Sequence, residues 1–129
     1  MKIEHFALNV KDPVAMAKWY SEHLGMRVVR AGAAPVYTTF LADETGQVMV
    51  EIYHNDSAPV PDYAEMDPLV VHMAFVAADD IRLTVDKLLD AGATLYSDIA
   101  LTAAGDQLVM LRDPWGFCIQ FAKRQKPMI

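Results

Sequence analysis

The feature that most constrains this chain is a weak internal repeat. A shift of 67 residues aligns similar residues in two stretches: His5 with His72, Ala7 with Ala74, Leu8 with Phe75, Asp12 with Asp79 and Gly25 with Gly92. In both copies an apolar run leads to an Asp, then to a helical pattern and then to a Gly. Self-similarity at a fixed period indicates one supersecondary unit used twice. We therefore expect an α+β fold made of two tandem βαβββ modules.

Each module is expected to hold one helix between an Asp N-cap and a Gly that stops the helix in a left-handed conformation. The cap and stop residues are Asp12 and Gly25 in the first copy, and Asp79 or Asp80 and Gly92 in the second. Apolar residues at helical spacing predict the buried stripe of each helix. These residues are Val14, Ala17, Trp19, Tyr20 and Leu24 in the first helix, and Ile81, Val85, Leu88 and Leu89 in the second.

The strands are expected in apolar runs bounded by turn residues. The predicted ranges are 3–10, 27–30, 36–42 and 47–54 in the first module, and 69–77, 94–97 (with pairing extending to 102), 107–112 and 117–123 in the second. The whole chain, residues 1–129, is interpreted as a single domain. Module 1 covers about 1–56, a proline-containing linker about 57–68, and module 2 about 69–123.

Composition and charge exclude several classes of protein. The 129 residues are 53% apolar, which is enough to build a core and argues against disorder. A net charge of −6 predicts no nucleic-acid partner and no attraction to anionic lipid. No apolar run approaches the roughly 20 residues of a membrane span. The N-terminus resembles no signal peptide, and one cysteine suits a reducing compartment, so we expect a cytoplasmic protein.

Side-chain alternation along the strands points to a candidate metal site. It places His5 and His72 at equivalent positions on the less apolar faces of the two modules. Glu51 and Gln120 lie on the same kind of face in the last strand of each module. Two imidazoles, a carboxylate and an amide oxygen suit Zn²⁺, Ni²⁺, Fe²⁺, Mn²⁺ or Co²⁺. The alternative is two structural histidines and a solvated carboxylate.

Several stretches resemble the glyoxalase/bleomycin-resistance/extradiol-dioxygenase superfamily, also called vicinal oxygen chelate proteins. The stretches are 3–10, 19–26, 50–52, 71–75 and 112–117, and the resemblance covers residues 1 to about 123. It implies curved mixed sheets around a central cavity, with the helices outside. In glyoxalase I-like members, the first and fourth strands of each module supply the metal ligands. The corresponding residues are His5, Glu51, His72 and Gln120.

Two positions depart from the family pattern. Gln120 stands where the family normally has a glutamate that is both ligand and proton-transfer base in glyoxalase I. An amide can donate its oxygen to a metal but cannot take a proton. Asn9 stands where bacterial glyoxalases have a glutathione-binding arginine. Both departures argue against activity on lactoylglutathione.

The leading hypothesis is a metal-dependent, glyoxalase-like lyase or isomerase that acts on a small carbonyl-containing substrate through an enediolate-type intermediate. Glu51 is the only carboxylate in the predicted ligand set, so it is the candidate for both ligand and proton shuttle. A dioxygenase is disfavoured, because those sites usually have their glutamate where Gln120 stands. The alternative is a metal-free small-molecule binding protein of the bleomycin-resistance type.

The resemblance also implies a homodimer. The sequence leaves open whether both modules of one site come from the same chain, which metal is bound and whether glutathione is required.

Overall fold

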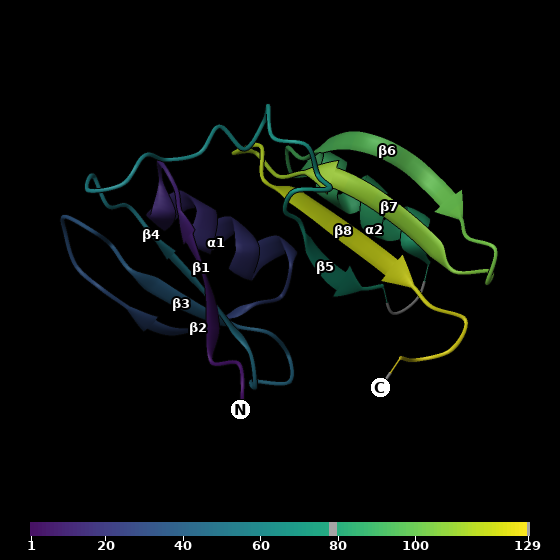
Figure 1. Cartoon of the computed structure of the whole chain (residues 1–129), viewed down its shortest axis with the longest axis horizontal. Coiled ribbons are helices and arrows are strands. Elements are labelled where there is room, and N and C mark those ends of the chain that lie inside the picture. Colours follow the sequence, from purple (N-terminus) through teal and green to yellow (C-terminus); the bar gives the residue numbers. More distant parts are fainter. Residues whose placement is uncertain (78–79, 129) are drawn as a thin grey trace. The chain divides into compact units, whose positions relative to one another are not determined.

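The structure, a computed structural model, describes residues 1–77 and 80–128. Asp79, one of the two candidate caps of the second helix, lies outside this part. The chain divides into two compact units, Met1–Pro61 and Asp62–Ile129. Each unit contains one helix and one four-stranded sheet (Figure 1).

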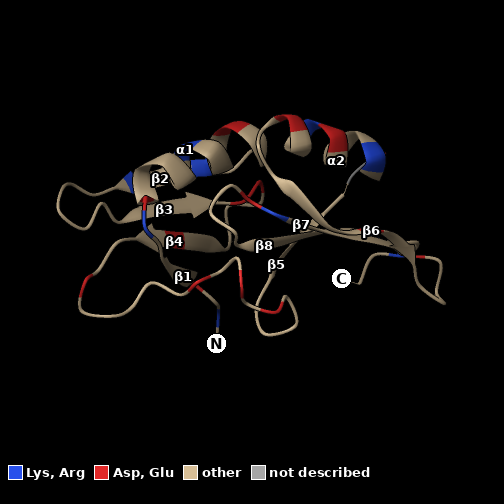
Figure 2. Ribbon diagram, turned by 90° about the horizontal axis from the view of Figure 1, so that it is seen from above, with Lys and Arg blue, Asp and Glu red and all other residues tan. Residues whose placement is uncertain are grey.

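The first unit is a βαβββ module. Its elements are β1 (His5–Asn9), α1 (Pro13–His23), β2 (Arg27–Ala31), β3 (Thr39–Ala42) and β4 (Met49–Tyr53). The strand order is β1-β4-β3-β2; β1 pairs parallel with β4, and the other pairs are antiparallel. α1 packs on one face of this sheet (Figure 2).

The second unit repeats this topology. Its elements are β5 (Met73–Val76), α2 (Ile81–Asp90), β6 (Thr94–Leu101), β7 (Gln107–Arg112) and β8 (Cys118–Lys123). The strand order is β5-β8-β7-β6, and β5 again pairs parallel with β8. The predicted α+β fold of two tandem modules is therefore confirmed.

Both helices begin and end where the cap residues predict. The Asp12 carboxylate accepts a hydrogen bond from the Ala15 N–H at 3.0 Å, and Asp80 accepts one from the Arg82 N–H at 2.9 Å. These bonds satisfy backbone donors that have no partner within the helix. The residue after each C-cap is a glycine with positive φ, Gly25 at 70° in α1 and Gly92 at 93° in α2.

The predicted buried stripes are wrong at two positions. Val14 is 54% exposed and Leu89 is 39% exposed, whereas Met16, which the prediction omitted, is fully buried. Each helical residue is rotated by about 100° from its neighbour, so a stripe that is one position out of phase turns away from the sheet. The residues that α1 buries are Pro13, Met16, Ala17, Trp19 and Tyr20.

The strand predicted over residues 69–77 is shorter than expected, which corrects the placement of His72. β5 begins at Met73, so His72 precedes the strand, and His5 is the first residue of β1. A turn explains the late start: Asp67 accepts hydrogen bonds from Leu69 N–H, through its side chain, and from Val70 N–H, through its carbonyl. Neither histidine therefore lies in the middle of a strand.

The strand predicted over residues 36–42 also starts late, at Thr39. The preceding loop makes its own hydrogen bonds, with Gly32 N–H donating to Thr38 O and Tyr37 N–H donating to Ala33 O. Tyr37 has a φ of 51°, which is incompatible with a strand. Local turn geometry therefore overrides the apolar pattern here.

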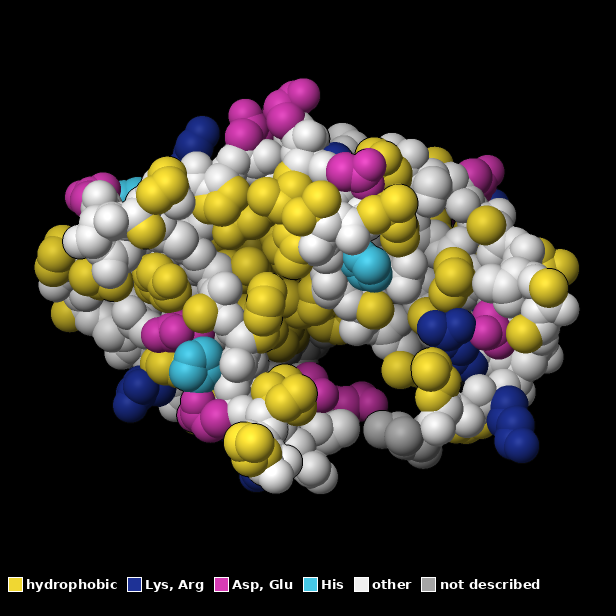
Figure 3. Space-filling view, viewed as in Figure 1, with side chains coloured by type: hydrophobic (Ala, Val, Ile, Leu, Met, Phe, Trp, Pro, Cys, Tyr) yellow, Lys and Arg dark blue, Asp and Glu magenta, His cyan; other side chains and the backbone are white. Residues whose placement is uncertain are grey.

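Some large apolar side chains reach the surface (Figure 3). In the second unit, four of the most exposed are Leu69, Val70, Val76 and Leu101. None of the described helices is both long enough and apolar enough to cross a membrane. The cytoplasmic location stays a prediction.

The turn between β7 and β8 depends on a glycine. Gly116 donates to Asp113 O, and the Asp113 carboxylate accepts hydrogen bonds from Trp115 N–H and Phe117 N–H. Gly116 has a φ of 87°, and a Cβ added to it would lie 2.7 Å from the backbone nitrogen of Ala64. Both the conformation and the space at this position therefore require glycine.

We expect Gly116→Ala to destabilise the protein more than Gly25→Ala does. Both residues have positive φ, but a Cβ on Gly25 would meet nothing within 4 Å. The left-handed conformation costs alanine about 1–2 kcal/mol, and the overlap with Ala64 adds about 1–3 kcal/mol at Gly116 only. Urea unfolding of both variants measures the difference, and equal losses would show that the contact with Ala64 is unimportant.

His54 ties the end of β4 to the end of β1. Its Nδ1 lies 2.7 Å from Val10 O and its Nε2 lies 2.9 Å from an Asp56 carboxylate oxygen. Two acceptors require an N–H on both ring nitrogens, which only the imidazolium has. The hydrogen bonds to Val10 and then to Asp56 therefore raise the pKa of His54 above 6.5.

We predict that Asp56→Asn lowers the pKa of His54 without returning it to 6.5, because the bond to Val10 remains. A raised pKa in the folded state stabilises the protein below the unfolded value, and this contribution disappears as the pH rises through the folded value. Wild type should therefore lose more stability than Asp56→Asn between acidic and mildly basic pH. NMR titration of the imidazole and unfolding at several pH values test this, with His23→Ala as a control for a histidine elsewhere.

Candidate functional site

A row of four side chains crosses the sheet of the first unit. The pairing register aligns Ala7 with Glu51, Glu51 with Phe40, and Phe40 with Arg30. Residues directly opposite each other on neighbouring strands point to the same face of a sheet. The alternate residues of β4, Val50 and Ile52, are buried on the face that α1 covers. The row therefore occupies the face away from the helix.

His5 lies on this same face because it is two residues before Ala7. Its Nε2 is 3.4 Å from a carboxylate oxygen of Glu51, and its Nδ1 is hydrogen bonded to the carboxylate of Glu4. The His5 ring also packs edge-on against Phe40, with the ring centroids 5.6 Å apart. The structure therefore brings together His5 and Glu51, two of the four predicted ligands.

The two carboxylates determine the charge of His5. The hydrogen bond to Glu4 raises the pKa of His5 above 6.5, and the charges of Glu4 and Glu51 raise it further, while burial lowers it. Glu4 also fixes the orientation of the ring by accepting from Nδ1. The nitrogen that faces Glu51 is therefore Nε2, which is free to bind a metal when it carries no proton.

The spacing of these two groups suits a shared metal ion. Two ligand atoms about 2.1 Å from a tetrahedral ion are separated by about 3.4 Å, which is the distance between His5 Nε2 and Glu51 Oε2. Over residues 1–77 and 80–128, no three or more His, Cys, Asp or Glu side chains are grouped to hold a metal. A metal ion held by His5 and Glu51 would therefore need further ligands.

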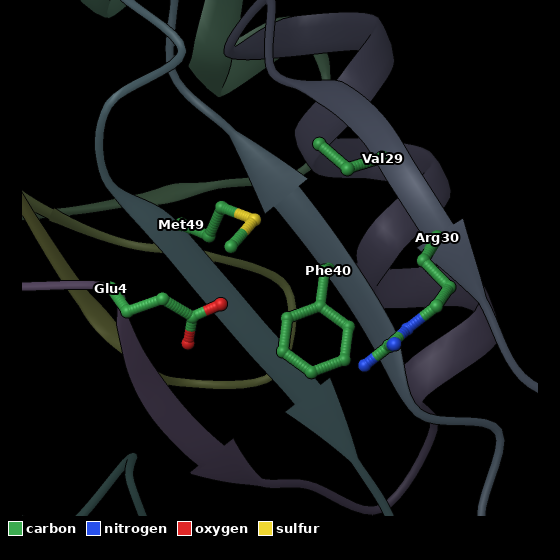
Figure 4. Close-up of a pocket in the computed structure, with 5 residues that line it drawn as sticks. All are labelled: Glu4, Val29, Arg30, Phe40 and Met49. Carbon is green, nitrogen blue, oxygen red and sulfur yellow. The ribbon is translucent and has the colours of Figure 1, made fainter.

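A cavity of about 280 Å³ lies in the first unit, next to residues that contact His5 and Glu51 and without either of these two in its lining. It is lined by Glu4, Val29, Arg30, Phe40 and Met49. Figure 4 shows the Phe40 ring between the carboxylate of Glu4 and the guanidinium of Arg30, and the guanidinium carbon lies 4.4 Å from the ring centroid. The cavity thus has an acidic side and a basic side.

The strand pairing of the second unit has the same register as that of the first. Ala74 pairs with Gln120, as Ala7 pairs with Glu51. His72 is two residues before Ala74, is exposed and has its Nδ1 2.7 Å from Pro68 O. Gln120 is only 9% exposed. The structure places these two residues in the second unit, and their union with His5 and Glu51 in one metal site stays a prediction.

Asn9 has a structural role in the first unit. Its side-chain amide donates to the carbonyls of Asn55 and Ala58, both at 3.1 Å, and its oxygen accepts from the Asn55 N–H at 2.9 Å. These bonds fasten the loop after β4 to the end of β1. At the position where the resemblance implies a glutathione-binding arginine, this chain therefore has an asparagine whose side chain is used in hydrogen bonds within the fold.

The sequence prediction missed Glu4, Phe40 and Arg30. The position of Glu4 next to His5 was a signal that could have been used, because a carboxylate beside a histidine ligand often orients it. Arg30 gave no comparable signal. It shares a face with Phe40 because the register shifts between Val28 and Arg30, and a bulge of this kind is not visible in the alternation of residues.

The comparisons with known proteins agree with this architecture. The family model of the Glyoxalase/Bleomycin resistance protein/Dioxygenase superfamily matches residues 2–121. A lactoylglutathione lyase from Haemophilus influenzae is 29% identical over 129 residues, which span 97% of this chain and 94% of that protein.

Two solved structures illustrate the fold. An enzyme of the same superfamily from Burkholderia phytofirmans has a TM-score of 0.77 and 16% identity, over 95% of this chain and 98% of that one. An antibiotic-binding protein from a Streptomyces species has a TM-score of 0.73 and 14% identity, over 97% of both chains. The sequence match extends over nearly all of both modules, and the solved folds have the same extent. The chain belongs to the Glyoxalase/Bleomycin resistance protein/Dioxygenase superfamily.

Proposed function

We propose that this protein is a metal-dependent lyase or isomerase acting on a small carbonyl-containing substrate. The observation that carries the proposal is the contact between His5 Nε2 and Glu51 in the first unit, at a distance that suits two ligands of one ion. The similarity to a lactoylglutathione lyase supports the reaction class. The proposed ligands are His5, Glu51, His72 and Gln120.

A bound divalent ion would supply the Lewis acidity that stabilises negative charge on a substrate oxygen. Glu51 is the proposed base: it would remove a proton from the hydroxyl-bearing carbon next to the carbonyl and return it to the former carbonyl carbon, while the hydroxyl proton moves from one oxygen to the other. Its side chain is 20% exposed, so it is accessible to a small ligand from the open face of the sheet. Glu4 orients His5 by accepting a hydrogen bond from its Nδ1.

Asn9 supports a substrate other than a glutathione adduct. Its side chain is bonded to Asn55 and Ala58, and it carries no charge that could bind a glutathione carboxylate. The cavity of about 280 Å³ in the first unit also suits a compact ligand. The proposal is therefore an enzyme for a small carbonyl compound, with a homodimer as the expected assembly.

The second candidate function is metal-free binding of a small molecule. Gln120 favours it, because a buried amide can neither act as a base nor contribute charge to a metal site. The fold similarity to an antibiotic-binding protein is compatible with this role. Metal content is the property that separates the two candidates.

We expect the protein, purified without chelators, to bind one Zn²⁺ or a related divalent ion, and His5→Ala to bind it at least about tenfold more weakly. The reason is the loss of a nitrogen ligand that faces Glu51. Calorimetric titration and elemental analysis provide the measurement. His23→Ala is the matched control, because His23 packs against Trp19 on α1 and is not a proposed ligand. Wild-type protein that takes up no metal under any loading condition would support the binding protein instead.

We expect Glu51→Gln to slow proton transfer by about 10²–10⁴-fold, because the amide has the same shape but cannot accept the proton. The reaction is followed by NMR as the exchange of carbon-bound protons for deuterium in D₂O. The substrates to compare are hydroxyacetone and the hemithioacetal of methylglyoxal with glutathione. Equal exchange rates in the wild type and the variant would remove Glu51 as the base.

A further inference from the structure

Arg30 is a cation that pairs with no carboxylate in the part of this acid-rich chain that the structure describes. The chain has 17 acidic and 11 basic residues, yet the Arg30 guanidinium forms no ion pair with any carboxylate of residues 1–77 and 80–128. The Arg30 guanidinium carbon lies over the face of the Phe40 ring, 4.4 Å from its centroid. The guanidinium also lines the cavity of the first unit, so its hydrogen-bond donors are available to a ligand there.

The fold puts Arg30 in this position through the bulge in β2. Arg27 pairs with Ala42 and Arg30 pairs with Phe40, two residues apart on β3, so the three-residue step along β2 is taken up by the irregularity at Val29. Without it, residues three apart on a strand would point to opposite faces. The bulge therefore adds Arg30 to the row that contains Glu51.

We propose that Arg30 binds a carboxylate of the substrate, and that the substrate is a small oxo acid with a second carboxylate beyond the carbonyl. This inference rests on the proposed function, because it assigns the carbonyl end of the molecule to His5 and Glu51. A guanidinium binds a carboxylate through two parallel hydrogen bonds, which makes this the favoured anion. Stacking on Phe40 restricts the plane in which the guanidinium offers those donors.

The distances limit the length of the substrate. Phe40 contacts both groups, with its centroid 5.6 Å from that of His5 and 4.4 Å from the Arg30 guanidinium carbon, so these groups lie no more than about 10 Å apart. A chain of two carbons between the carbonyl and the distal carboxylate spans this separation when allowance is made for the contacts at each end.

The polarity of the cavity sets the orientation of the substrate. Glu4 lies on the cavity wall and repels an anion, and its carboxylate is hydrogen bonded to His5. Arg30 attracts an anion on the other side of Phe40 (Figure 4). The distal carboxylate is therefore directed to Arg30. The carbonyl and the carboxylate attached to it are directed to His5 and Glu51, where the proposed metal ion would offset the charges of Glu4 and Glu51.

The test compares two acids that differ only in the distal group, α-ketoglutarate and α-ketovalerate. Their affinities are measured by calorimetry for the full-length protein, both loaded with Zn²⁺ and free of metal. We expect α-ketoglutarate to bind the wild type at least about tenfold more tightly. Arg30→Gln should remove this advantage while leaving α-ketovalerate unaffected, and Arg30→Lys should restore part of it.

Arg27→Gln is the matched control. Arg27 is on the same strand and has the same charge, but it is not part of the cavity wall and its guanidinium lies near Gly46. We expect this variant to keep the full advantage of α-ketoglutarate. Circular dichroism and thermal unfolding verify that all variants are folded.

The outcomes separate this inference from the proposed function. Equal affinity of the wild type for the two acids, or no binding of either, overturns the carboxylate site. If Arg27→Gln and Arg30→Gln lose the affinity advantage of α-ketoglutarate equally, the carboxylate site is also overturned. The advantage would then come from the net charge of the protein and not from the position of Arg30. If Zn²⁺ does not bind but the advantage persists in metal-free protein and depends on Arg30, the carboxylate site stands and the metal-dependent function fails.

Discussion

The parallel pairing of β1 with β4 is the constraint on which the candidate site depends. It aligns Ala7 with Glu51 and so brings Glu51 within reach of His5, from a segment more than forty residues away in the chain. Side chains alternate between faces, so a slip of one residue would turn Glu51 toward α1 and Ile52 toward the open face. The burial of Val50 and Ile52 under the helix resists such a slip. Packing on one face thus maintains the chemistry on the other.

Around His5 the electrostatics favour positive charge of any kind. Glu4 and Glu51 both raise the pKa of the imidazole, so in the absence of metal the site holds a proton more firmly than an isolated histidine does. The same two carboxylates would also favour a divalent cation in the proposed metal site. There a proton and the metal ion would compete for Nε2.

The repeat, the helix caps and the turn residues could all be predicted from the sequence, because each depends on neighbouring residues. Asp12, Asp80, Gly25 and Gly92 are examples of such local signals. The alternation on β4 was also predictable, because one of its faces is buried under α1.

Other features depend on contacts between distant segments or on irregular backbone. The start of β5 is set by the turn at Asp67, which the apolar run from Leu69 concealed. The bonds from Asn9 to a loop over forty residues away left no pattern in the sequence. The position of Arg30 depends on a bulge in β2.

The bulge in β2 has a consequence for how this family can diversify. If β2 were regular from Val28 to Arg30 with no residue removed, Arg27 and Arg30 would be three positions apart and would point to opposite faces. An irregularity at one point of an outer strand can thus decide which side chains lie on this face while β1 and β4 keep their pairing. The proposed carboxylate site on β2 and the proposed metal ligands on β1 and β4 are on separate strands, which allows one to evolve without the other.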